Sequence, residues 1–233
     1  MSKVERAFEI ARETYADTGV DVENAMKQLA SFNLSIHCWQ GDDVRGFEQR
    51  SYPLSGGIMT TGNYLGRARN QNELWMDLEK TLSLIPGKHR VNLHASYGMF
   101  DKSVERNEIL PEHYVSWVDW ARENDVNLDF NATLFSHPRA ESGFTLSSKN
   151  IEVRKFWVEH VKRSREVAAY IGSKQESPCI HNLWIPDGMK DQTIDKAAYR
   201  NNLKDSLDDI YSKKYDKSLI KDSLEPKLFG NGI

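Results

Sequence analysis

Short runs typical of β-strands alternate with amphipathic helical stretches along most of this chain. We predict strands over 33–39, 90–95, 126–131 and 177–185, and the beginning of a fifth strand at 227–230. Helical periodicity fills the stretches between them, and Asn70, Ser148 and Asp195 are placed to cap three of the helices. Strands that alternate with helices form parallel βαβ units. The pattern therefore restricts the chain to an α/β fold with a parallel sheet.

The N-terminal segment predicts helices and no strand. Apolar residues recur there at helical spacing before Gly19, and a shorter helix follows over 22–29. No shift in composition divides the rest of the chain. We therefore expect a single domain over 1–233, with a helical N-terminal extension over 1–32 and βα units over 33–233.

The distance between strands decides between two α/β architectures. From His37 to Phe229 the predicted strand ends are about 48 residues apart, so eight units need about twice the 233 residues of this chain. The alternative is a complete, open, doubly wound sheet. No G-x-G-x-x-G or G-x-x-x-x-G-K-[ST] motif follows any predicted strand, as many such sheets require. We therefore favour the N-terminal half of a (β/α)8 TIM barrel, with about four βα units.

The composition excludes several classes of partner. A net charge of -3 provides no basic excess for nucleic acid, and no apolar run is long enough for a membrane helix. The N-terminus lacks the apolar core of a secretory signal, and neither Cys38 nor Cys179 belongs to a CxxC motif. We expect a cytoplasmic protein with free thiols, no nucleic-acid or membrane partner, and a small-molecule substrate.

Polar and aromatic residues mark the predicted strand ends, which converge on one mouth in a parallel barrel. His94 is the favoured acid or base, because imidazole titrates near neutral pH. A buried histidine bonded to a neighbouring strand is the alternative. Trp39, Trp184 and Phe130 are candidates for an apolar wall against a sugar, and ordinary aromatic core is the alternative for each. The long loop over 40–66 is expected to be ordered near this site.

Patterns for a carboxylate pair or a metal site are less specific in this sequence. Asp129 and Asn131 alternate along one strand and point the same way, and Asp129 with Asp187 could supply the carboxylate pair of a glycosidase. There is no HExxH, CxxC or EF-hand motif, and His37, His94, His137 and His181 are scattered without diagnostic spacing. The residues alone therefore predict no metal site.

Eight blocks of sequence point to a known family. They are HCWQGDD (37–43), GGIMTTGNY (56–64), NLHA (92–95), LDFN (128–131), FSHP (135–138), GFTLS (143–147), WIPDGMKD (184–191) and KLFG (227–230). In order and spacing the blocks closely resemble the L-rhamnose isomerases, over essentially the whole of 1–233. Matches as long as WQGDD and WIPDGMKD are highly specific.

The resemblance implies a cytoplasmic aldose–ketose isomerase that interconverts L-rhamnose and L-rhamnulose. It also implies a (β/α)8 barrel, assembly as a homotetramer, and divalent metal, typically manganese (Mn²⁺), with one structural and one catalytic ion. In such isomerases the sugar ring opens before hydrogen moves between C1 and C2, and the metal polarises the carbonyl and hydroxyl oxygens.

The resemblance also assigns individual residues. His94 matches a histidine that contacts the sugar ring oxygen and assists ring opening, Trp184 matches a tryptophan of the substrate pocket, and Phe130 is a weaker match to the apolar wall. The family's metal-binding Glu, Asp and His residues belong to the second half of the barrel. We therefore expect no metal ligand in this chain and no isomerase activity from the chain alone. The alternative is a non-catalytic fragment that binds sugar or docks to a partner.

Overall fold

Five parallel strands form the main sheet. The computed structural model describes residues 1–49, 65–226 and 231–232. Within them the strands are β1 (Ser35–His37), β2 (Arg90–His94), β3 (Asn127–Asn131), β4 (Cys179–Ile185) and β6 (Ile220–Pro226). They lie in the order β1-β2-β3-β4-β6, and every neighbouring pair is parallel. The order follows the chain without the reversal that a doubly wound sheet requires.

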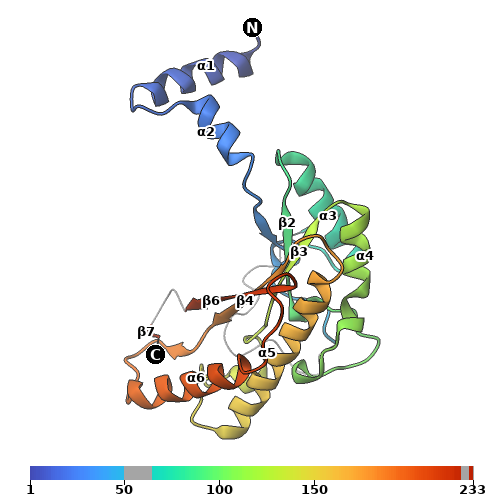
Figure 1. The fold of residues 1–233 in the computed structure, drawn as a ribbon, viewed down its shortest axis with the longest axis vertical. Helices are drawn as coiled ribbons and strands as arrows, with labels where there is room; N and C mark the ends of the chain where they lie inside the picture. Colours follow the sequence, from blue (N-terminus) through green and yellow to red (C-terminus); the bar gives the residue numbers. More distant parts are fainter. Residues whose placement is uncertain (50–64, 227–230, 233) are drawn as a thin grey trace.

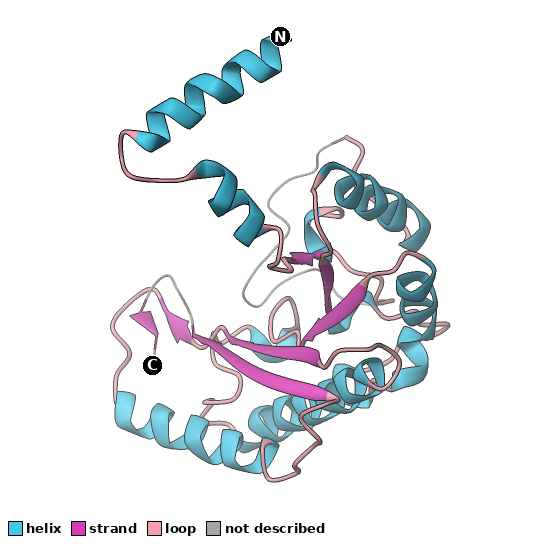
Figure 2. Cartoon of the chain, turned by 45° about the horizontal axis from the view of Figure 1, so that its top comes forward, coloured by secondary structure: helices cyan, strands magenta, loops and turns pink. Residues whose placement is uncertain are grey.

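The helices between the strands lie on one side of this curved sheet (Figure 2). They are α3 (Gln71–Leu84), α4 (Val115–Glu123), α5 (Ile151–Gly172) and α6 (Lys196–Ile210). Helices on one side only, combined with strands in chain order, are consistent with part of a βα barrel. The described strands form an open curved sheet, and its concave face carries no helix.

Alternation along each strand separates the two faces. On β4, Cys179, His181, Leu183 and Ile185 are buried, while the residues between them are only half-buried. The buried set packs against the helices, where two hydrophobic clusters form around Trp117 and Trp157. The half-buried set, which includes Asn182 and Trp184, faces the concave side.

Two of the three predicted caps are confirmed. The side chain of Asn70 accepts a hydrogen bond from the backbone N–H of Glu73 (3.0 Å), and that of Asp195 accepts one from Ala198 (3.3 Å). The cap predicted at Ser148 is wrong. Helix α5 begins two residues later, where the side chain of Asn150 accepts from the N–H of Glu152 (2.9 Å). 

The fifth strand begins earlier than the sequence predicts. The sequence predicts it at 227–230, which lie outside the described residues, whereas β6 spans Ile220–Pro226 and pairs with the whole of β4. Of its seven residues only Ile220 is buried. The segment therefore lacks the apolar alternation by which a strand is recognised in a sequence.

The N-terminal helices α1 (Lys3–Ala16) and α2 (Val22–Leu29) extend away from the sheet (Figure 1). Both predicted helices are confirmed, and a capping box at Ser2 starts the first. Neither helix has a buried residue. The apolar side chains that suggested a packed face, such as Val4 and Tyr15, are 78% and 55% exposed.

Shorter elements complete the description. Single 3-10 turns span Cys38–Gln40, Ala95–Tyr97, Arg106–Glu108, Pro111–Tyr114 and Pro138–Ala140. Two short antiparallel strands, β5 (Gly188–Met189) and β7 (Asn231–Gly232), pair beyond the edge of the main sheet. No helix in the described ranges is long and apolar enough to cross a membrane.

Candidate active site

His94 ends β2 on the concave side of the sheet, where it contacts the next strand. Its Nε2 lies 3.2 Å from Nδ2 of Asn131, and its Nδ1 lies 3.4 Å from Oγ1 of Thr133. Because an amide nitrogen can only donate, Nε2 accepts and the ring proton is on Nδ1. Burial lowers the pKa of His94 to about 3, and the charges of His37 and Arg106 act in the same direction. The imidazole is therefore neutral at physiological pH.

A row of aromatic rings surrounds His94. The ring centroid of His94 is 5.9 Å from Trp39 and 5.6 Å from Phe135, and Phe135 is in turn 5.6 Å from Trp184. His37 lies beside them, with its centroid 6.3 Å from that of His94. Three of the predicted residues, His94, Trp39 and Trp184, thus gather at the carboxyl ends of the strands. Phe135 joins this row without having been predicted.

The structure does not place Phe130 in this row. Its side chain is fully buried and packs edge-on against Tyr114, with ring centroids 5.0 Å apart. The reason is alternation: Asp129 and Asn131 face the concave side, so Phe130 between them points into the core under the helices. Phe135, which follows the strand, therefore contacts His94 and Trp184 at the strand ends, and Phe130 does not.

An ion pair and four hydrogen bonds fix the loop that carries Phe135. Arg106 is 1% exposed and forms a two-pronged ion pair with Glu48, at 2.8 Å and 3.0 Å. Its guanidinium also donates to the carbonyl oxygens of Thr133, Phe135 and Ser136. From the other side, Nε2 of His160 accepts from the N–H of Thr133 (3.0 Å). These contacts hold the turn after β3 in the position that brings Phe135 against His94.

The loop after β1 is ordered in its described part. Asp42 is buried and accepts hydrogen bonds from the N–H of Gly46 (2.7 Å) and from the hydroxyl of Tyr97. Burial raises the pKa of this carboxyl, against the effect of its hydrogen bonds. The N–H of Val44 donates to the carbonyl of Trp39 (3.0 Å), which joins this loop to the site. The rest of the predicted loop, including the GGIMTTGNY block, lies outside the described residues.

Glu225 is a residue of this face that the sequence reasoning missed. It lies near the end of β6, and Nδ2 of Asn182 donates to its Oε2 (2.7 Å). Its charge opposes the burial that lowers the pKa of His37. The missing signal was the strand boundary: a strand that ends at 226 puts Glu225 at the mouth, whereas a strand over 227–230 does not.

The two carboxylates of the glycosidase alternative are both engaged in structural contacts. Asp129 is 2% exposed, forms a two-pronged ion pair with Arg90 (2.7 Å and 2.9 Å), and also accepts from Ser35 and the N–H of Ile180. Asp187 accepts four hydrogen bonds from the backbone and hydroxyl groups of Thr145 and Ser147. Burial raises the pKa of Asp187. Neither carboxylate is presented to a substrate.

The other predicted histidines pack elsewhere. His137 stacks on Phe156 with ring centroids 5.0 Å apart, and its Nδ1 accepts from the N–H of Arg139 (3.1 Å). His181 is buried on the helix-covered face, where its Nδ1 lies 3.3 Å from Asp222. Of the scattered histidines, therefore, only His37 and His94 meet.

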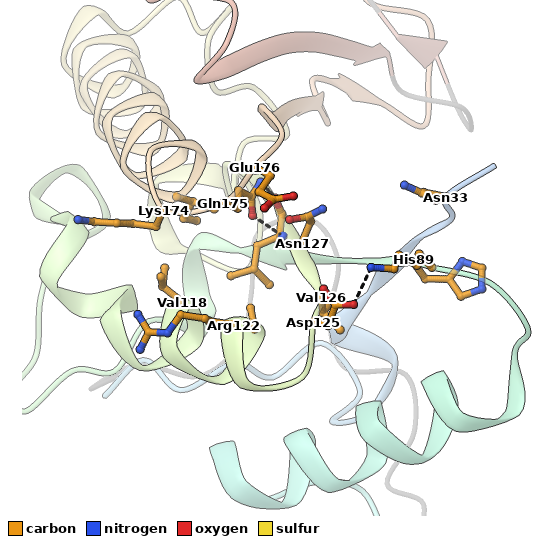
Figure 3. Close-up of a pocket in the computed structure, with 14 residues that line it drawn as sticks. Asn33, His89, Val118, Arg122, Asp125, Val126, Asn127, Lys174, Gln175 and Glu176 are labelled. Carbon is orange, nitrogen blue, oxygen red and sulfur yellow. Dashed lines mark hydrogen bonds and ion pairs between the residues drawn. The ribbon is translucent and has the colours of Figure 1, made fainter. Parts of the chain in front are cut away.

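A cavity of about 420 Å³ lies at the opposite, amino ends of the strands (Figure 3). Gln175 spans part of it, accepting from the N–H of Leu128 (2.8 Å) and donating to the carbonyl of Leu128 (3.0 Å). Nδ1 of His89 accepts from the N–H of Leu34 (3.2 Å). These side chains form hydrogen bonds to the backbone at the amino ends of the strands. Catalytic residues of βα barrels lie at the carboxyl ends.

The comparisons with known proteins identify the family. The family model described as L-rhamnose isomerase (RhaA) matches residues 2–233. The chain belongs to the L-rhamnose isomerase family. It is 53% identical over 231 residues to the L-rhamnose isomerase of Klebsiella pneumoniae subsp. pneumoniae, 52% to that of Enterobacter sp. (strain 638) and 51% to that of Salmonella gallinarum. Each match covers 99% of this chain and 55% of the relative, so the chain spans about half the length of these L-rhamnose isomerases.

The metal that the family resemblance implies can be compared with the side chains at the strand ends. Within 1–49, 65–226 and 231–232, no group of three or more His, Cys, Asp or Glu residues could hold a metal ion. At the mouth, Glu225 contributes a carboxylate, and His37 and His94 contribute neutral imidazoles. The described residues therefore do not by themselves fit a metal centre.

Proposed function

We propose that the protein containing this chain is an L-rhamnose isomerase, which interconverts the aldose L-rhamnose and the ketose L-rhamnulose. The observation that carries this proposal is the match to the family model over 2–233, together with identities of 50–53% to curated L-rhamnose isomerases. The arrangement of the site supports it, since a neutral imidazole and an aromatic wall converge at the end of a parallel sheet. No contact among the described residues favours the non-catalytic alternative.

His94 would assist ring opening. The neutral ring holds its proton on Nδ1, and its single Nε2 lone pair accepts a hydrogen bond from the Asn131 amide, which the anomeric hydroxyl of the sugar would replace. That lone pair can accept the proton of the anomeric hydroxyl as the bond between C1 and the ring oxygen breaks, and can return the proton to the ring oxygen. No net proton is gained or lost, and the aldose is left in its open-chain form.

The aromatic residues would bind and orient the sugar. Trp39, Phe135 and Trp184 present ring faces and edges around His94, and L-rhamnose has apolar C–H faces and a terminal methyl group that such rings bind well. They would also exclude water from the oxygen atoms near His94. In this role Phe135 replaces Phe130.

The remaining expectations from the resemblance belong to the same proposal. The strands β1–β4 and β6 would be part of a (β/α)8 barrel in a cytoplasmic homotetramer, with residues 1–32 as a helical extension of one domain over 1–233. Manganese, bound largely by groups outside the described residues, would polarise the carbonyl and hydroxyl oxygens of the open-chain sugar. 

The test is ketose formation from L-rhamnose by the purified full-length protein, with added manganese. Formation of L-rhamnulose is expected, and its absence at saturating sugar and metal overturns the proposal. The same assay on the 233-residue chain checks the expectation that this part alone is inactive. Turnover by that chain would contradict the expectation without contradicting the family activity.

A further inference from the structure

We propose that His37 and Trp39 together bind one hydroxyl group of the sugar, with Nε1 of Trp39 as the donor and Nδ1 of His37 as the acceptor. This inference rests on the proposed function, because it names how the same mouth recognises an aldose. It adds His37 to the site and gives Trp39 a polar role besides its contribution to the apolar wall.

Both residues are held at the mouth by their place in the chain. His37 ends β1, and Ser35 two residues earlier donates to Asp129 on the concave side (2.6 Å), so alternation points His37 to the same side. The 3-10 turn that follows brings Trp39 back against His37. Their rings meet edge to face with centroids 5.6 Å apart, and His94 lies 6.3 Å from the one and 5.9 Å from the other.

Two polar atoms of this pair are buried without a hydrogen-bond partner in the part of the chain that the structure describes. They are Nδ1 of His37 and Nε1 of Trp39. Buried polar atoms are nearly always hydrogen-bonded, because an unpaired one costs about 1–3 kcal/mol. His94, which is buried beside the half-buried His37, has a partner within 3.4 Å of each ring nitrogen. These two unpaired atoms therefore indicate a ligand group that forms hydrogen bonds with both of them.

A hydroxyl group has the hydrogen-bonding capacity that this pair requires. It accepts one hydrogen bond and donates another, whereas the indole N–H can only donate and a neutral imidazole nitrogen can accept. Burial lowers the pKa of His37, although the charges of Glu225 and Asp129 act against it. A neutral His37 keeps a lone pair on Nδ1 when its proton is on Nε2. A carboxylate or phosphate ligand would leave that lone pair unmet, so a polyhydroxyl compound is favoured.

The experiment measures discrimination between L-rhamnose and its monodeoxy analogues in the full-length enzyme. Isothermal calorimetry gives the affinity for each sugar, and kcat and KM are measured where turnover occurs. We expect one analogue, which lacks the bound hydroxyl, to bind at least tenfold more weakly than L-rhamnose. Trp39→Phe removes the donor and keeps an aromatic ring, and it should weaken L-rhamnose binding at least fivefold while leaving that one analogue unaffected.

Two substitutions of His37 separate the roles of its nitrogens. His37→Asn places an amide near the position of Nδ1 and should retain most of the discrimination. His37→Gln places the amide near the position of Nε2 and should lose the discrimination. A matched control is Trp75→Phe, which removes another buried, unpartnered indole N–H, from a ring that packs against Trp117 and Trp120 on the helix side of the sheet. Sugar affinity should be unchanged in this control.

The outcomes distinguish the inference from the proposed function. The hydroxyl site is overturned if Trp39→Phe and both His37 variants bind all the sugars more weakly by one common factor. It is also overturned if none of these variants binds any sugar more weakly. Circular dichroism and thermal melting of each variant show whether folding accounts for a loss. If the wild type binds the sugars with the expected discrimination but forms no ketose, the hydroxyl site stands and the proposed isomerase activity fails.

Discussion

Nδ2 of Asn131 lies 3.2 Å from Nε2 of His94, which joins the ends of β3 and β2 on the concave side of the sheet. The contact fixes the tautomer of the histidine, because the amide donates and the ring nitrogen must accept. A histidine at a strand end could be either a packed structural residue or a chemical group at the mouth. Here the hydrogen bond that packs His94 also occupies its Nε2 lone pair, so a sugar hydroxyl must replace the Asn131 amide before that nitrogen can take part in chemistry.

The buried histidines should make the protein less stable in mild acid. The pKa values of His94 and His160 are both lowered to about 3, mainly by burial. Below the ordinary pKa of about 6.5 the unfolded chain takes up these protons and the folded chain does not, so each residue costs about 1.4 kcal/mol of stability per pH unit on acidification. Urea unfolding between about pH 7 and about pH 5 should show this loss. A pH-independent midpoint, or an NMR titration of either ring near neutrality, would contradict the assignment.

Asp129→Asn should strongly destabilise the sheet. It breaks the buried ion pair with Arg90 and leaves a guanidinium without its carboxylate, at a cost of about 3–5 kcal/mol. The control is Asp125→Asn, which breaks the exposed pair with Lys88 and should change little. Denaturant unfolding of both variants measures the difference. Equal midpoints for the two variants would show that Asp129 does not have the structural role described here.

Arg106→Lys should loosen the turn that carries Phe135. Lysine keeps the charge but cannot form the two-pronged pair with Glu48 and also reach three carbonyl groups. We expect a loss of about 2–4 kcal/mol and faster hydrogen exchange of the amides after β3. Arg122→Lys, at an exposed pair with Asp119, is the matched control. Unchanged exchange rates in Arg106→Lys would be evidence against this role.

Removal of residues 1–32 should leave the sheet intact. Neither α1 nor α2 contains a buried residue, so their loss removes little packed apolar area from the rest of the chain. The stability of the remaining residues should fall by less than about 0.5 kcal/mol, as for surface changes in general. Thermal unfolding of the shortened protein is the measurement. A drop of several degrees would mean that the helices pack against the rest of the chain.

Much of the fold could be predicted because local signals and packing agree. The strands around Ile36, Leu93, Phe130 and Leu183 were found from their apolar residues, and α3 and α6 from caps that the structure confirms. The fifth strand was misplaced because the apolar residues of KLFG lie just after β6, whereas most residues of β6 itself are polar and Ile220 alone is buried. Its position depends on pairing with β4, which local periodicity does not report.

The site was predicted in part for a similar reason. Strand ends could be read from the sequence, so the proximity of His94, Trp39 and Trp184 could be predicted, and the ring contacts show it. Phe130 was assigned to the wall although its neighbours Asp129 and Asn131 already implied the opposite face. Phe135 could not be placed, because its position depends on the contacts of Arg106 with the turn after β3. Such long-range contacts leave no local pattern in the sequence.

The proposed role of His94 is tested by comparing the rate of L-rhamnulose formation in the full-length enzyme with that of its His94→Gln variant. His113→Gln is the control, because His113 lies outside the mouth and caps the turn at Leu110. We expect ketose formation by the wild type and by the control. In His94→Gln we expect kcat to fall by about 100-fold or more, the scale of general acid–base catalysis. Wild-type activity retained in His94→Gln would contradict the central claim that this mouth opens the sugar ring.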